Sequence, residues 1–271
     1  MLKFFRKIRQ DLIMESKTGR PAWPLGRYIK YAIGEIVLVV IGILIALQVN
    51  NYNNQQKTHD REIALLKDLE IDLEMADEKN KKQISWFRQS QDIHYQIYHE
   101  SLGQGSFDST MRYHDLVWTA IVRDFISENY HSRMHEISDE RLKRILRDYL
   151  WREQLVMEAI NEWNDTKMDK VRPFLEKNGL YNNEVVFNDK PYEFMNIGKD
   201  GLVIDYNRLT EHYGSQELDQ LLYTLRHSAS WCLHCMGKLD EASTNLNLAL
   251  DYFIDGEADK LEDIKPLEGY Y

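Results

Sequence analysis

One apolar stretch, Tyr31 to Val49, constrains this chain more than any other feature. It holds 19 residues, which as an α-helix extend over about 28 Å. The hydrocarbon layer of a membrane is about 30 Å thick, so this length is sufficient to cross it. A cleavable signal peptide has a shorter apolar region, and a buried core helix carries a polar stripe. The stretch therefore predicts an uncleaved transmembrane helix.

Charge is distributed unevenly on the two sides of this stretch. Residues 1–30 contain eight Lys or Arg and two acidic residues, a balance of +6, whereas the remainder contains 26 basic and 42 acidic residues, a balance of −16. Because basic flanks stay on the cytoplasmic side of a membrane, we expect a cytoplasmic N-terminus and a periplasmic bulk, anchored in the inner membrane of a Gram-negative cell. Nucleic acid is not an expected partner, because phosphate binding needs concentrated Lys and Arg.

The remaining sequence has the composition and pattern of a helical protein. It contains only 5 prolines and 13 glycines, and long segments place apolar residues three or four positions apart, which is typical of helices. This pattern predicts a helix from Ile63 to Leu102, a second helix with Ser138 as its N-cap, and a final helical pair over residues 215–255. We expect one or two shorter helices within 108–134, with Ile121 facing inward.

These elements define three parts of the chain. Residues 1–30 form a basic amphipathic cytoplasmic segment, residues 31–50 the transmembrane helix, and residues 51–271 a periplasmic α-helical domain. No Pro or Gly follows the apolar stretch directly, so the transmembrane helix is expected to continue beyond the membrane. The predicted fold class is all-α, with one N-terminal transmembrane helix continuing into a periplasmic helical bundle.

Two segments resemble a known family. The sequences "MLKFFRKIRQDLI" and "YIKYAIGEIVLVVIGILIALQVNNYN" are similar to the opening of domain-of-unknown-function family 6090, a Bacteroidota family of uncharacterised single-pass membrane proteins. A later block, "FISENYHSRMHEISDERLKRILRDYL", is more distantly similar to a second helical block of that family. The resemblance implies a topology and a lineage, but no activity.

Glu35 lies one turn inside the apolar segment, where an acidic side chain is costly to keep. On a helical wheel it shares a face with Gly42 and Ala46, two small residues of the kind that lets a neighbouring helix approach closely. Three roles are compatible with this position: an interfacial residue at the membrane edge, a contact in an oligomer or with a partner, and a proton relay.

Both cysteines of the chain, Cys232 and Cys235, occur in the segment "SWCLHCMGK". In an oxidising compartment such a pair can form a disulfide. A thioredoxin-like redox motif needs a strand before the first cysteine, but the preceding residues read as helix. The alternatives are packed thiols, a structural disulfide, a metal site and a catalytic pair.

Glu128, His131 and His135 have the spacing of metal ligands on one helix. They are weak candidates, because a di-iron bundle requires two such motifs on separate helices. No metal or other cofactor is expected. The chain also lacks a phosphate-binding loop, a nucleophile elbow and an H-E-x-x-H zinc motif.

The sequence favours a non-enzymatic inner-membrane protein. Its transmembrane helix is expected to contact the lipid bilayer and to associate with copies of itself or with an inner-membrane protein complex. Its periplasmic domain is expected to serve as a scaffold or as a sensor surface. The first alternative is an accessory subunit of an ion- or proton-coupled membrane complex, with Glu35 titrating. The second is a redox or metal enzyme that uses Cys232 and Cys235.

Overall fold

The computed structural model describes residues 24–106, 116–188 and 204–265. Within these ranges regular structure is helical, and the only β feature is an isolated antiparallel bridge between Tyr181 and Ile204. The predicted all-α class is therefore confirmed. The chain divides into two compact units, Met1–Asp60 and Arg61–Tyr271. Most of the predicted basic segment lies outside the described residues.

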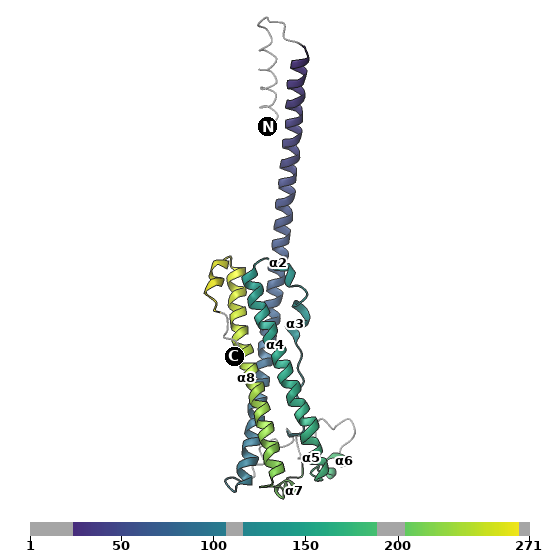
Figure 1. Cartoon of the computed structure of the whole chain (residues 1–271), viewed down its shortest axis with the longest axis vertical. Coiled ribbons are helices and arrows are strands. Elements are labelled where there is room, and N and C mark those ends of the chain that lie inside the picture. Colours follow the sequence, from purple (N-terminus) through teal and green to yellow (C-terminus); the bar gives the residue numbers. More distant parts are fainter. Residues whose placement is uncertain (1–23, 107–115, 189–203, 266–271) are drawn as a thin grey trace. The chain divides into compact units, whose positions relative to one another are not determined.

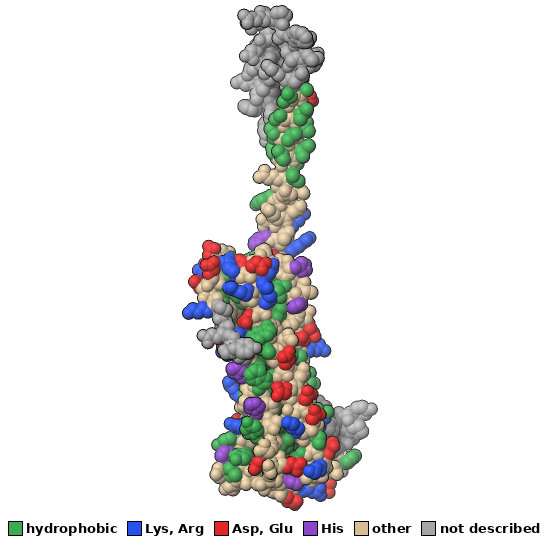
Figure 2. Space-filling view, viewed as in Figure 1, with side chains coloured by type: hydrophobic (Ala, Val, Ile, Leu, Met, Phe, Trp, Pro, Cys, Tyr) green, Lys and Arg blue, Asp and Glu red, His purple; other side chains and the backbone are tan. Residues whose placement is uncertain are grey.

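Helix α2, Pro24–Ser101, is a single helix of 78 residues. From Ala32 to Asp60 every side chain on it is exposed, and Figure 2 shows the apolar side chains on this helix. The apolar part of α2 is long enough to cross a membrane, which indicates membrane anchoring. The expectation that the apolar helix continues without a break is confirmed, since no Pro or Gly lies between Gly42 and Ser101.

The unit Arg61–Tyr271 contains the rest of α2 and the other described helices (Figure 1). Three of them are long: the second part of α2, α4 (Glu140–Thr166) and α8 (Gln216–Ile254). The short elements are α3 (Phe125–Tyr130), the 3₁₀ helix η3 (Met134–Glu136), the π-helix η4 (Lys167–Val171), α5 (Arg172–Lys177), α6 (Asn183–Asn188), α7 (Tyr206–Thr210) and the 3₁₀ helix η6 (Ala258–Asp263).

The three long helices form a bundle in which α4 packs along α8 (Figure 1). Helices α2 and α8 are antiparallel, because Asn80 donates to the carbonyl of Met236 at 3.1 Å and Gln91 donates to the hydroxyl of Ser230 at 2.6 Å. Figure 1 shows that α8 also runs antiparallel to α4, so α2 and α4 run in the same direction.

Apolar side chains at helical spacing form the core. Leu66, Leu69 and Leu73 of α2 are fully buried, as their spacing predicts. Trp163 of α4 is also fully buried, and its ring centroid lies 5.4 Å from that of Phe87. Burial of each such side chain stabilises the fold by about 1.5–3 kcal/mol. The long helices therefore depend on one shared core.

Within the predicted helical range 108–134, helix α3 confirms a short helix, whereas the described residues 118–124 before it are not helical. The side chain of Asn164 accepts a hydrogen bond from the Ala120 N–H and donates one to the Ala120 carbonyl, both at 2.9 Å. This holds residues 118–124 in an irregular conformation. Ile121 consequently points outward and is 89% exposed, so the prediction that it faces the core is wrong.

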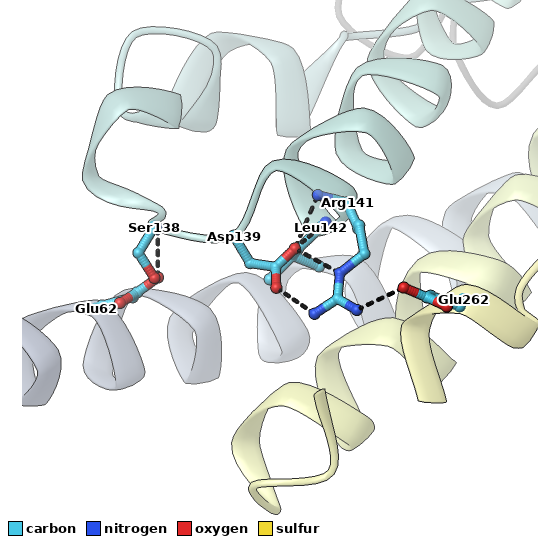
Figure 3. A network of polar contacts seen from close by, with 6 residues as sticks. All are labelled: Glu62, Ser138, Asp139, Arg141, Leu142 and Glu262. Atoms are coloured by element: carbon cyan, nitrogen blue, oxygen red, sulfur yellow. Dashed lines mark hydrogen bonds and ion pairs between the residues drawn. The ribbon is translucent and has the colours of Figure 1, made fainter. Parts of the chain in front are cut away.

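The start of α4 lies one residue later than predicted (Figure 3). Asp139, rather than Ser138, is its N-cap, and its carboxylate accepts hydrogen bonds from the N–H groups of Arg141 and Leu142. Ser138 is engaged elsewhere, because its N–H and its hydroxyl both donate to Glu62 of α2. Because Ser138 is bound to Glu62, Asp139 is the residue that caps α4.

The last helical region is one helix and not the predicted pair. Ser215 is its N-cap, as expected, and its hydroxyl accepts from the N–H of Leu218. The helix then continues through Gly237 to Ile254. A single glycine costs about 1 kcal/mol in a helix, which the buried apolar face of α8 outweighs.

Candidate functional site

Glu35, Gly42 and Ala46 are all exposed on α2. At 3.6 residues per turn they lie along one face of the helix. A Cβ atom built on Gly42 would meet no other atom within 4 Å. Within the described chain this face is therefore open to lipid or to another helix.

Cys232 and Cys235 lie in the middle of α8, and both are fully buried. They are not joined by a disulfide. The thiol of Cys232 donates to the carbonyl of Ala159 on α4 at 3.3 Å. Burial, with a smaller contribution from Cys235, raises the pKa of the Cys232 thiol to about 12. This environment disfavours the thiolate that redox chemistry and metal binding require.

The three weak metal candidates do not share a helix. Glu128 lies on α3, which ends at Tyr130, whereas His135 lies in η3 and bonds through Nδ1 to the carbonyl of Ser132 at 2.8 Å. His131 follows α3 as its C-cap. Within the described ranges, no group of three His, Cys, Asp or Glu side chains has the geometry of a metal site.

The comparison with family models finds one match, which covers part of α2. Residues 35–92 match DUF6090, a family of unknown function. The resemblance noted in the sequence is thereby confirmed over these residues. The DUF6090 match begins at Glu35, includes Gly42 and Ala46, and stops before α4 and α8. No curated protein and no solved structure matches this chain.

Two buried carboxylates outside the predicted sites each accept hydrogen bonds from the backbone of another segment. Glu153 of α4 accepts from the N–H groups of Ile126 at 3.1 Å and Ser127 at 2.7 Å, and so caps the start of α3. Burial raises the pKa of Glu153, although these hydrogen bonds oppose the shift. Glu62 of α2, within the DUF6090 match, accepts hydrogen bonds from the N–H and the hydroxyl of Ser138, the residue before the N-cap of α4.

The side chains of His94, Trp163 and Lys167 lie together in the interior of the bundle. The ring centroids of His94 and Trp163 are 5.8 Å apart, and the ammonium of Lys167 lies 4.5 Å from the centroid of the Trp163 ring. All three side chains are buried. Burial lowers the pKa of His94 well below 6.5, and the nearby positive charges of Lys167 and Arg226 act in the same direction. The imidazole is therefore neutral at neutral pH.

Sequence reasoning missed these buried polar residues, although a signal was present. Glu62 precedes Leu66 and Leu69 at the spacing of the apolar face of α2, and Glu153 stands between Leu150 and Val156 on that of α4. His94 similarly lies between Phe87 and Ile97 on α2. A polar residue at a core position must find a partner or carry a cost.

Proposed function

We propose that this protein is a non-enzymatic, single-pass inner-membrane protein with a periplasmic helical domain that acts as a scaffold. Its apolar helix associates with copies of itself or with a membrane partner. The observation that supports this most is the exposed face of Glu35, Gly42 and Ala46, which combines a carboxylate with two small residues inside an apolar segment. Small residues allow helix backbones to approach closely in lipid.

The orientation of the protein follows from charge. The balance of +6 in residues 1–30 favours a cytoplasmic N-terminus. Residues 61–271 would then fold in the periplasm, and the burial of both thiols is compatible with that oxidising compartment. Accessibility of residues 61–271 to protease in spheroplasts, with the inner membrane intact, would support this orientation; protection would contradict it.

The association is tested by purifying the full chain from membranes in a mild detergent and measuring the mass of the complex. We expect a homo-oligomer or a stoichiometric complex that dissociates in Gly42→Leu. Gly34→Leu is the matched control, because a Cβ on Gly34 also meets nothing within 4 Å and Gly34 lies off the proposed contact face. A monomeric parent protein, or equal dissociation in both variants, would contradict the proposal.

The carboxylate of Glu35 is also compatible with a second function. Glu35 lies in an otherwise apolar segment, so an accessory role in an ion- or proton-coupled complex would use it as a titrating group. A Glu35→Gln variant that assembles normally but loses its cellular phenotype would favour this role. Full function of Glu35→Leu would exclude it, with Gln48→Leu, on another face of the helix, as the control.

A further inference from the structure

A groove between α2 and α8 is lined by side chains that the proposed function does not use. Its volume is about 540 Å³, which lies within the range of small-ligand sites, about 300–1,000 Å³. Two helix faces form its walls, and the residues that matter for its chemistry are His94, Tyr95 and Tyr98 of α2 and Asp219, Tyr223 and Arg226 of α8.

Hydrogen bonds beyond the two ends of this groove join α2 to α8 and to the turn that precedes α8. Beyond one end, Gln91 donates to the hydroxyl of Ser230 at 2.6 Å. Beyond the other end, the hydroxyl of Tyr213, in the turn before α8, donates to Glu100 of α2 at 2.8 Å. The walls are therefore fixed by contacts that do not involve a ligand, and such preorganisation lowers the cost of binding.

The groove contains buried polar atoms that no described residue satisfies. His94 is only 1% exposed, and neither Nδ1 nor Nε2 of its ring has a hydrogen-bond partner among the described residues. The same holds for Oδ1 of Asp219. Since a neutral imidazole carries one donor and one acceptor, these side chains present one donor and two acceptors. Unsatisfied buried polar atoms are costly, so a ligand that satisfies them gains affinity.

Aromatic rings form the outer part of the groove. Tyr95, Tyr98 and Tyr223 are 52%, 40% and 67% exposed, which is high for large aromatic side chains. The guanidinium of Arg226 lies 5.4 Å from the centroid of the Tyr95 ring. Exposed rings that gather in one concave surface mark a binding site more often than scattered ones do.

The charges of the groove balance. Among the described residues that line it, Arg226 is the only Lys or Arg and Asp219 the only Asp or Glu, beside the two histidines His94 and His99. An anion attracted by Arg226 would meet the carboxylate, and a cation attracted by Asp219 would meet the guanidinium. A neutral ligand avoids both conflicts. Hydroxyl groups can donate to Asp219 and can either donate to His94 or accept from it.

We infer that this groove binds a short neutral saccharide. Its hydroxyls hydrogen-bond to His94 and Asp219, and the apolar C–H face of a sugar ring packs on the exposed tyrosine rings. No covalent step is involved. All the residues named above that line the groove lie outside the matched residues 35–92. Gln91, which bonds to Ser230 beside the groove, is within the match. The site is therefore a property of this chain rather than of the matched segment.

The test is isothermal titration calorimetry on the full chain in a polyoxyethylene ether detergent, which carries no sugar headgroup. The probes are glucose, galactose, mannose, N-acetylglucosamine, maltose and cellobiose. We expect saturable binding of at least one of them with a Kd below about 1 mM. Tyr223→Ala and Asp219→Asn should each weaken that binding about tenfold or more.

Asp251→Asn provides the matched control, because Asp251 is exposed on the same helix and lies outside the groove; it should bind as the parent does. Circular dichroism confirms that each variant is folded before titration. The inference is overturned if none of the six saccharides saturates the parent protein, or if Tyr223→Ala and Asp219→Asn bind as tightly as the parent. It is also overturned if the zwitterion glycylglycine binds more tightly than every saccharide.

Discussion

His94 sets a pH dependence on the stability of the bundle. Its pKa in the folded protein lies well below 6.5 because the ring is buried. Above about pH 6.5 the ring is neutral in both states and its contribution is constant; below that pH the unfolded chain takes up a proton that the folded protein does not. The free energy of unfolding therefore falls as the pH drops, by up to about 1.4 kcal/mol per pH unit.

Thermal unfolding between about pH 7 and pH 5 measures this effect. The comparison with His94→Leu isolates it, because carboxyls such as Glu153, whose pKa is raised by burial, titrate in both proteins. We expect the decrease in Tm to be smaller in His94→Leu. His135→Gln, which removes an exposed histidine, should retain the decrease of the parent. An identical pH profile in His94→Leu would refute this account.

The two thiols allow a second prediction at the scale of the residue. Cys232 is fully buried, and its pKa is raised to about 12, so little thiolate exists at neutral pH. Under native conditions we expect Cys232 to react with a thiol reagent at least about 100-fold more slowly than in the denatured chain. Mass spectrometry of alkylated peptides over time measures this rate. Rapid native modification would instead support the redox alternative.

At the scale of the element, helix ends are decided by single polar side chains. Asp139 caps α4 through two backbone N–H groups and also pairs with Arg141, whose side chain is the main cause of the lowered pKa of Asp139 (Figure 3). We expect Asp139→Ala to lower the free energy of unfolding by about 1 kcal/mol. Urea denaturation monitored by circular dichroism measures the loss.

Asp139→Asn separates the cap from the ion pair. Asparagine caps helices about as well as aspartate, but it cannot form the charged pair with Arg141. Since a partly exposed ion pair contributes little, about 0–1 kcal/mol, this variant should recover most of the stability that alanine loses. If Asp139→Asn is as unstable as Asp139→Ala, the ion pair, and not the cap, holds this end of α4.

At the scale of the whole molecule, the core belongs to one of the two units. All buried apolar residues of the described chain lie between Leu65 and Ile264, and none lies before Arg61. We expect a chain that begins at Arg61 to remain soluble and helical and to unfold cooperatively. Near-ultraviolet circular dichroism and a thermal melt provide the measurement. Loss of the near-ultraviolet signal in this shortened chain would show that residues 1–60 contribute to the fold.

Local sequence was sufficient for the helical class, the apolar segment and the faces of the long helices, because the spacing of apolar residues is a property of neighbouring positions. Local sequence did not predict the conformation of a segment whose hydrogen-bond partner lies far away in the chain. Asn164 holds Ala120 and turns Ile121 outward, and Glu62 engages Ser138 so that the cap passes to Asp139. The groove has the same origin, since His94 and Asp219 become neighbours only when α2 and α8 pack together. Periodicity predicts which face of a helix is buried, but contacts between helices depend on packing that no single segment encodes.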